Sequence, residues 1–107
     1  RMTKSLLEVV VDCTAIFAIS DSFAIGAVRA LIDAGKRVPM DISVAGFDGT
    51  EMAAYYNPSI TTIRQPAETM ARETIKLLFD SIKKKTNVQQ LIFEGELVPG
   101  ESVKKLN

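Results

Sequence analysis

Three short polar stretches of the 107-residue sequence carry the side chains that could do chemistry, and each follows a run of apolar residues. In chain order they supply Ser20, Asp21, Asp48, Gly49, Arg64 and Gln65. Their hydroxyl, carboxylate, guanidinium and amide groups suit hydrogen bonding to a polyhydroxylated or similarly polar small molecule. None of them shows the pattern of an activated nucleophile. The set therefore indicates binding, with no catalytic residue.

Each of these side chains also has a structural interpretation, and the residues alone leave both roles open. Ser20 and Asp21 can accept hydrogen bonds from the free N–H groups at the start of a helix. Asp48 precedes a glycine, so it can instead shape a turn. Gln65 can cap the helix that follows it, and Arg64 can be a solvated surface charge.

Composition narrows the classes of function. The sequence has no His and a single Cys, Cys13. His-dependent catalysis, His-ligated zinc and an internal disulfide are therefore excluded within this chain, and we expect no metal and no cofactor. Lys plus Arg at 13 equals Asp plus Glu at 13, so this segment lacks the positive charge needed to hold DNA by itself. No apolar stretch is long enough to cross a bilayer.

The hydrophobic pattern alternates between extended segments and helices. Extended segments are expected at residues 15–19, 42–47, 60–63, 91–93 and 96–98. Helices are expected at residues 23–34, 51–56 and 66–83, and a helix is favoured over a strand at residues 3–11. The apolar run at 15–19 is typical of a strand buried on both faces of a parallel sheet. The order predicts an α/β fold, a mostly parallel sheet flanked by helices.

A ligand site is expected at one edge of that sheet. In open parallel sheets, ligands bind in crevices outside the carboxyl ends of the strands. The three polar stretches follow three predicted strands, so we expect them to meet at this edge. A chain of this length can form one core but not two lobes around a cleft, so we expect part of any cleft to come from outside it.

The predicted helix at residues 23–34 carries two apolar stripes. The first contains Ala24, Ala27, Val28 and Leu31, and the second contains Ile25, Val28 and Ile32. We expect the first stripe to pack closely on the sheet through Gly26 and the alanines. The second stripe needs another neighbour, either a second subunit or a second helix of the same domain.

Several motifs follow one another along the chain: TAIFAISDSFAIGAVRALIDAG, then KRVPMDISVAGFDGTEMAAYYNPSITTIRQP, then a helix that ends in LLFDSI. In order and spacing they resemble the carboxyl-terminal part of the effector-binding domain of the LacI/GalR family of bacterial transcriptional regulators. The likeness runs from about residue 14 to residue 102. One departure is that Pro99 and Gly100 replace the family's Arg before Glu-Ser.

The resemblance implies a type I periplasmic-binding-protein-like fold with two Rossmann-like lobes. Residues 1–107 would be a single fragment of the effector-binding and dimerisation domain, with residues 14–65 as the core of the carboxyl-terminal lobe. Residues 66–98 would normally pack on the amino-terminal lobe. Their apolar faces would lack that partner within this chain, so we expect a rearranged or swapped packing.

The resemblance also assigns roles to individual residues. Asp48 matches the Asp of the family's GFD or GYD motif, and Ser20 stands where the family usually has an effector-contacting Asn. With Asp21, they form the expected effector site. Gln65 and Pro66 match the crossing between the lobes and would act as a hinge.

Three further residues fall on surfaces that resemble the family's dimer interface, namely Ile25, Val28 and Tyr56. The implied function is the ligand-sensing and dimerisation part of a sugar-responsive repressor. It would act in the cytoplasm as a homodimer, bind a sugar or sugar derivative, and reach operator DNA through a helix-turn-helix absent from this chain.

An extracytoplasmic sugar-binding protein of an ABC transporter has the same core fold and is the alternative. The run VPMDISVAGFD resembles the regulators more. An enzyme on a similar sheet is a third possibility that no set of residues supports.

Overall fold

The structure of the chain is a computed structural model that describes residues 2–9, 12–84 and 90–106. In the described residues, helices and strands alternate in the order α1 (Met2–Val9), β1 (Ala15–Phe17), α2 (Asp21–Asp33), β2 (Ser43–Ala45), α3 (Glu51–Tyr55), β3 (Thr62–Arg64), α4 (Ala67–Lys84) and β4 (Glu96–Val98). The predicted α/β fold is confirmed. The chain divides into two compact units, Arg1–Arg64 with Leu97–Asn107, and Gln65–Glu96.

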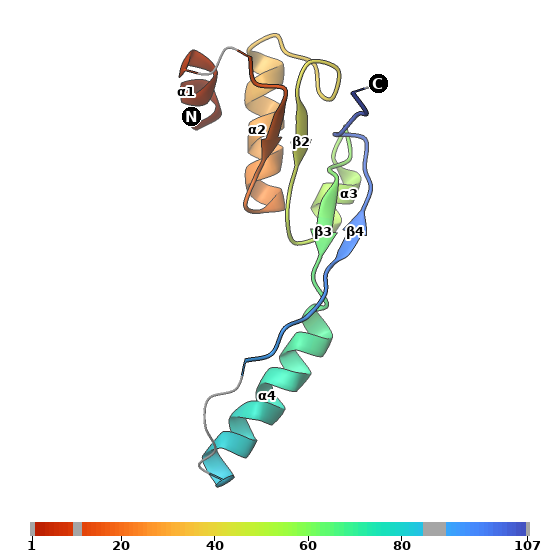
Figure 1. Cartoon of the computed structure of the whole chain (residues 1–107). Coiled ribbons are helices and arrows are strands. Elements are labelled where there is room, and N and C mark those ends of the chain that lie inside the picture. The colour runs from red at the N-terminus through yellow and green to blue at the C-terminus, as the bar shows by residue number, and fades with distance from the viewer. Residues whose placement is uncertain (1, 10–11, 85–89, 107) are drawn as a thin grey trace. The chain divides into compact units, whose positions relative to one another are not determined.

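The strands of the first unit lie side by side in the order β1, β2, β3, β4 (Figure 1). β1 and β2 are parallel, with Ile16 opposite Val44. Isolated parallel bridges from Ala45 to Thr61 and from Asp48 to Arg64 extend this pairing to β3. β4 pairs with β3 and runs in the opposite direction. The predicted parallel order therefore holds for β1, β2 and β3.

The core of the first unit lies between α2 and the strands. Ala24, Val28 and Leu31 of α2 are 0% exposed, as is Val44 of β2. The first apolar stripe of α2 is therefore confirmed as the buried one. Each fully buried Val or Leu side chain contributes about 1.5–3 kcal/mol relative to its exposed state.

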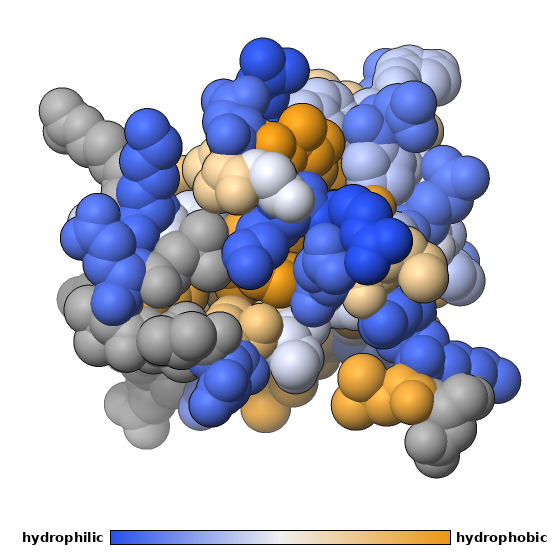
Figure 2. Space-filling model, turned by 90° about the horizontal axis from the view of Figure 1, so that it is seen from above, coloured by the Kyte–Doolittle hydropathy of each residue, from blue (hydrophilic) through white to orange (hydrophobic). Residues whose placement is uncertain are grey.

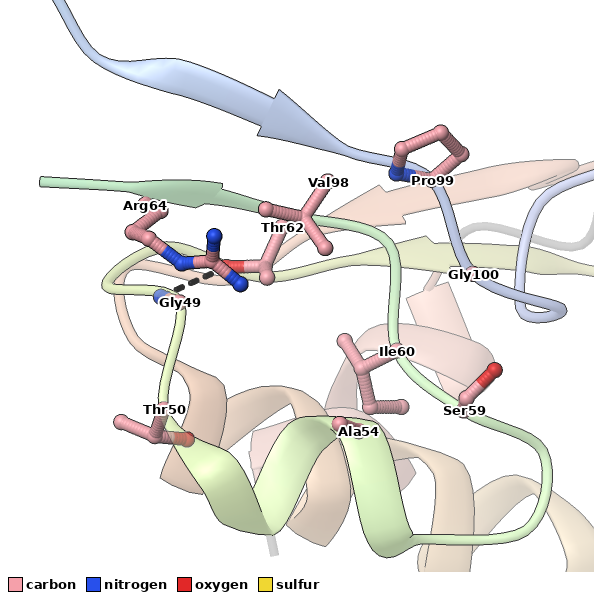
Figure 3. A pocket seen from close by; sticks show the side chains of 10 residues that line it. All are labelled: Gly49, Thr50, Ala54, Ser59, Ile60, Thr62, Arg64, Val98, Pro99 and Gly100. Carbon is pink, nitrogen blue, oxygen red and sulfur yellow. Dashed lines mark hydrogen bonds between the residues drawn. The ribbon is translucent and has the colours of Figure 1, made fainter.

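The expectation that residues 15–19 are buried on both faces is wrong. Phe17 is 67% exposed and Ile19 is 72% exposed. The reason is that α2 and α3 lie on the same side of the strands (Figures 1 and 3). Within the described part of this unit, no helix covers the other face of β1.

The expected close packing of α2 through Gly26 is also wrong. Gly26 is exposed, and a Cβ added there would meet no atom within 4 Å. The close approach is instead at Gly46, just after β2. A Cβ added at Gly46 would lie 2.6 Å from Asp21 Oδ1 and 3.1 Å from the Ala24 Cβ. The glycine that allows the close packing is therefore Gly46, which follows β2, and not Gly26 of α2.

The ends of α2 follow the predicted signals. The Ser20 Oγ accepts a hydrogen bond from the Phe23 N–H at 3.2 Å, so Ser20 is the N-cap. Gly35, with φ of +80°, ends the helix in a left-handed conformation that glycine adopts without strain. The helix favoured at residues 3–11 is found as α1, and residues 10 and 11 lie outside the described residues.

Several strands are shorter than predicted. Only Ser43–Ala45 of the segment 42–47 is a strand, the segment 60–63 contributes to β3 at Thr62–Arg64, and residues 91–93 form none. Residues 38–41 form a turn.

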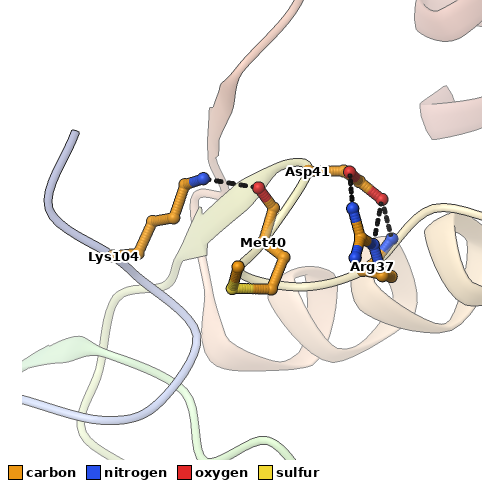
Figure 4. A network of polar contacts seen from close by, with 4 residues as sticks. All are labelled: Arg37, Met40, Asp41 and Lys104. Atoms are coloured by element: carbon orange, nitrogen blue, oxygen red, sulfur yellow. Dashed lines mark hydrogen bonds and ion pairs between the residues drawn. The ribbon is translucent and has the colours of Figure 1, made fainter. Parts of the chain in front are cut away.

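That turn is fixed by one ion pair at an exposed surface (Figure 4). The Arg37 Nε and Nη2 donate to the two Asp41 carboxylate oxygens at 3.1 and 3.0 Å. The hydrogen bonds from Arg37 lower the pKa of Asp41 to about 2. The Lys104 Nζ donates to the Met40 carbonyl at 2.6 Å, which ties the carboxyl-terminal segment to the turn.

Hydrophilic side chains cover much of the face seen in Figure 2, with apolar ones between them.

The carboxyl-terminal segment fills a gap between β2 and β3. Ser102 is 0% exposed, and its Oγ accepts from the Thr61 N–H at 2.9 Å and donates to the Val44 carbonyl. The Val44 N–H donates to the Ser102 carbonyl at 2.9 Å. This segment thus completes the hydrogen bonding of strands that share only isolated bridges.

The second unit is built on α4, whose polar and apolar residues are segregated at helical spacing. The predicted helix at 66–83 is confirmed, although it begins at Ala67 rather than at Pro66. Its apolar side chains remain largely exposed, at 55% for Ile75, 57% for Leu78 and 67% for Ile82.

Candidate functional site

The structure brings the three polar strand ends together. The Asp21 N–H donates to the Phe47 carbonyl at 2.9 Å, which joins the start of α2 to the end of β2. The Asp48 N–H donates to the Ile63 carbonyl at 2.9 Å, and Asp48 bridges to Arg64. The expectation that these stretches meet at the carboxyl ends of parallel strands therefore holds.

Asp48 occupies an unusual backbone conformation. Its φ is +128°, and it is the one described residue other than glycine with a positive φ. Such a conformation costs about 1–3 kcal/mol for a residue with a side chain and is concentrated at binding and catalytic sites. Asp48 is also an exposed residue. Backbone strain and exposure together mark it as the strongest binding candidate of the site.

Gly49 continues the same turn with φ of +75°. A Cβ added there would lie 2.5 Å from the Arg64 Cα, so the loop passes directly against β3. Only glycine fits this close approach without moving the neighbouring backbone.

Ser20 and Asp21 have structural partners in the described structure. Ser20 is half-buried and caps α2 through its Oγ. Asp21 is 1% exposed; its Oδ1 accepts from the Thr62 Oγ1 at 2.6 Å, and its Oδ2 accepts from the Thr50 N–H at 2.7 Å and Oγ1 at 2.9 Å. Contact of Ser20 or Asp21 with an effector stays a prediction.

Thr50 and Thr62 are the site residues that sequence reasoning missed. Thr50 is the N-cap of α3, and Thr62 is 3% exposed within β3. Thr62 also accepts from the Gly49 N–H at 3.2 Å. The only signal for Thr62 was a hydroxyl in an otherwise β-branched segment, and such residues are found in strands for their shape alone.

A small hollow lies beside this loop, with a volume of about 150 Å³ (Figure 3). Arg64, Thr50 and Ser59 supply polar groups to its wall, whereas Ser20, Asp21 and Asp48 do not line it. Sites for drug-sized ligands occupy about 300–1,000 Å³. The hollow can therefore hold only part of such a ligand.

The predicted hinge residues stand where the two compact units are divided. Arg64 ends one segment of the first unit, and Gln65 begins the second. The Gln65 carbonyl accepts from the Ala67 N–H at 2.8 Å, and the Pro66 carbonyl accepts from the Met70 N–H at 2.8 Å. These bonds form the first turn at the start of α4. Hinge motion at Gln65 and Pro66 stays a prediction.

The predicted dimer residues have different exposures. Ile25 and Tyr56 are half-buried and pack against the core, while Val28 is 0% exposed within it. Ile25 and Tyr56 therefore offer the accessible part of this set. Exposed apolar side chains of α2 and α3 include Phe23, Ile32, Met52 and Tyr55.

In the part of the chain that the structure describes, no group of three or more Cys, Asp or Glu side chains could hold a metal ion. No helix among these residues is long and apolar enough to span a membrane.

The fold and the polar strand ends define a periplasmic binding protein-like domain, and the model of that family matches residues 3–103. The transcriptional regulator MalR of Clostridium butyricum is 48% identical over 99 residues, which are 92% of this chain and 30% of MalR. The transcriptional repressor PurR of Vibrio vulnificus is 40% identical over 96 residues, which are 88% of this chain and 28% of PurR.

Solved structures give the same result. A complex of the regulator CelR with cellobiose superposes with a TM-score of 0.86 and 38% identity, covering 94% of this chain and 31% of CelR. A lac repressor dimer bound to operator and the anti-inducer ONPF has a TM-score of 0.85 and 29% identity, covering 95% of this chain and 36% of that protein.

The chain belongs to the LacI/GalR family, as a part of its periplasmic binding protein-like domain. It spans about a third of the length of these relatives. The named relatives are transcriptional regulators, which favours the regulator interpretation over that of a transport component.

Proposed function

We propose that this chain is the ligand-sensing and dimerisation part of a transcriptional repressor that responds to a sugar or sugar derivative. The observation that carries the proposal is the strained, exposed Asp48 at the meeting point of three polar strand ends. A carboxylate in this place can accept two hydrogen bonds from vicinal hydroxyl groups. The cellobiose bound by CelR supports a carbohydrate as the ligand class.

Effector contacts are assigned to Asp48 first, with Ser20 and Asp21 at the same edge. Asp48 is exposed, whereas Asp21 is 1% exposed with both of its carboxylate oxygens hydrogen-bonded. Asp48 is therefore the residue whose change tests the site most directly. The hollow of about 150 Å³ is too small for a disaccharide, so a second lobe would complete the cleft.

Residues 14–65 form the core of one lobe, and residues 66–98 pack on the other in this proposal. The exposed apolar side of α4 supports that packing, because Ile75, Leu78 and Ile82 remain more than half exposed. Gln65 and Pro66 would then be hinge residues between the lobes. Effector binding in the cleft would favour one orientation of the lobes by its higher affinity for that state.

The homodimer would use the outer sides of α2 and α3. Ile25 and Tyr56 offer partly exposed apolar surface there, with Val28 supporting them from the core. The operator-bound lac repressor is a dimer, which supports a homodimer as the state of the protein that carries this chain.

Operator DNA would be bound by a helix-turn-helix outside this chain, in the cytoplasm. Equal numbers of basic and acidic residues support the assignment of DNA binding elsewhere. Neither effector binding nor DNA binding requires catalysis, a metal or a cofactor.

The test is calorimetric titration of the complete gene product that carries this chain with cellobiose, maltose, lactose, ribose and free purine bases. We expect one sugar to bind and Asp48→Ala to weaken it at least tenfold, which is about 1.4 kcal/mol. Asp33→Ala is the matched control, because Asp33 is an exposed residue in the last turn of α2. Unchanged affinity in Asp48→Ala would remove Asp48 from the site. Tightest binding of a purine base would replace the sugar class.

A further inference from the structure

We propose that Asp21 is a positioning residue, which acts with Thr62 to hold residues 47–50 in the backbone conformation that presents Asp48. These four residues are called the Asp48 loop. The ligand that Asp48 would contact rests on the proposed function, whereas the positioning itself can be measured without a ligand. This role differs from both capping of α2 and direct effector contact.

Each successive residue of the Asp48 loop is hydrogen-bonded either to Asp21 or to β3. The bonds, in chain order, are the Phe47 carbonyl with the Asp21 N–H at 2.9 Å, the Asp48 N–H with the Ile63 carbonyl at 2.9 Å, the Gly49 N–H with the Thr62 Oγ1 at 3.2 Å, and the Thr50 N–H with the Asp21 Oδ2 at 2.7 Å. The loop is therefore fixed at four consecutive points. Asp21 provides the first and the last of them.

The Asp21 carboxylate is itself held in one place. It is 1% exposed, and its oxygens accept from Thr62 at 2.6 Å and from Thr50 at 2.7 and 2.9 Å. Gly46 leaves the room that it occupies, because a Cβ there would lie 2.6 Å from Oδ1. A buried carboxylate must keep its donors, since leaving a buried acceptor unmet is costly.

Thr62 connects the carboxylate to the strained part of the loop. Its Oγ1 donates to Asp21 Oδ1 and accepts from the Gly49 N–H, so one hydroxyl joins the two. Asp48 and Gly49 have φ of +128° and +75°. Conformations of this kind persist only where surrounding contacts enforce them. In this proposal, the hydrogen bonds of Asp21 and Thr62 are the contacts that hold Asp48 and Gly49 in these conformations.

The test uses amide hydrogen exchange in the complete gene product without ligand. Thr62→Val removes the hydroxyl and keeps the branched shape of the side chain. We expect exchange at the amides of residues 48–50 to rise at least tenfold while the amides of residues 27–31 in α2 stay protected. Thr62→Ser restores the hydroxyl and should bring the exchange back toward the wild-type rate.

A matched control is available one residue earlier. Thr61→Val removes a hydroxyl that accepts from the Gly100 N–H at 2.9 Å rather than one that contacts the Asp48 loop. It should leave exchange at 48–50 unchanged. Thr50→Ala is the second variant, at an exposed position, and removes one donor to Asp21 together with the side-chain cap of α3, without changing β3. It should raise exchange at the amides of residues 48 and 49, which are not part of α3.

The outcomes separate this inference from the proposed function. Wild-type exchange at 48–50 in folded Thr62→Val, or at 48 and 49 in Thr50→Ala if the first variant does not fold, would overturn the positioning role. Faster exchange that Thr62→Ser reverses supports it, even if Asp48→Ala leaves cellobiose, maltose, lactose and ribose binding unchanged. That last result would overturn only the ligand role of Asp48.

Discussion

The helices α2 and α4 both carry an apolar stripe at helical spacing, yet their stripes lie in different environments. In α2, Ala24, Val28 and Leu31 are 0% exposed. In α4, Leu78 is 57% exposed and Ile82 is 67% exposed. Residue spacing decides that an apolar face exists, but a neighbouring element decides whether it is buried. Within the described residues of its own unit, α2 has strands to pack on, whereas α4 (described at residues 67–84, with 90–96) has none.

The largest expected effect comes from truncating a matched leucine on each helix of this chain. Leu31→Ala should lower the free energy of unfolding by about 2–5 kcal/mol, because it opens a cavity in a closed core. Leu78→Ala should change it by less than about 1 kcal/mol, since that side chain is mostly exposed. Urea denaturation followed by circular dichroism measures both. Equal losses would show that the α4 stripe is covered in solution.

A second comparison uses two glycines, Gly46, which follows β2 and faces the buried side of α2, and Gly26, which lies on the exposed side of α2. Gly46→Ala should lower the free energy of unfolding by about 1–3 kcal/mol, because its Cβ would lie 2.6 Å from Asp21 Oδ1. Gly26→Ala should raise it by up to about 1 kcal/mol, because that position is open and alanine favours helix. Thermal unfolding of the two variants gives the signs. A loss at Gly26 would mean that a neighbour covers the outer side of α2.

A third change tests the exposed stripe of α4 directly. Ile82→Lys in this chain should alter the free energy of unfolding by no more than about 0.5 kcal/mol while lowering self-association beyond the proposed α2 and α3 dimer in sedimentation velocity. Lys76→Ala, an exposed change on the same helix, is the control and should leave association as it is. Association beyond that dimer that persists in Ile82→Lys would place the additional contact on another surface.

The smallest expected effect is on the acid stability of the first unit. Arg37 lowers the pKa of Asp41 from 3.8 to about 2, so the folded state binds this proton more weakly than the unfolded state. The stabilisation is present above pH of about 4 and is lost as the pH falls toward about 2. Asp41→Asn should therefore flatten the pH dependence of unfolding in that window. Arg37→Lys should flatten it in part, because it loses the two-pronged contact but keeps the charge.

A pair on α4 provides the comparison for that measurement. Glu68 and Arg72 make a single exposed contact of 3.3 Å, whereas the Asp41 carboxylate accepts two hydrogen bonds from the Arg37 side chain and one from the Arg37 N–H at 2.7 Å. Glu68→Gln should change acid stability less than Asp41→Asn, because single surface pairs contribute little. An equal change in acid stability in the two variants would show that the contact geometry of an ion pair does not govern its effect on acid stability.

Much of the site was predictable from local chemistry. Polar residues after apolar runs indicated that Ser20, Asp48 and Arg64 stand at strand ends, because a strand that leaves the core ends in solvent-compatible residues. The exposure of Phe17 could not be predicted in this way. An apolar run is the same whether a helix covers its second face or not, so its environment depends on which elements surround it.

The network beneath the site was equally hidden. Asp21 bonds to Thr50 across 29 residues and to Thr62 across 41 residues, so no local pattern links these residues. Ser102 bonds to Val44 across 58 residues in the same way. Such residues resemble ordinary caps and strand residues until the chain is folded.

The sequence by itself determined where the helices begin and end, which side of each is apolar, and which polar residues terminate the strands. These features depend on capping, on glycine and on residue spacing, which act over a few residues. The tertiary structure alone decided that Asp21 is buried among threonines, that Asp48 has a positive φ, and that Gly46 rather than Gly26 allows the close approach. These depend on contacts between distant segments, which exist only when the strands have come together.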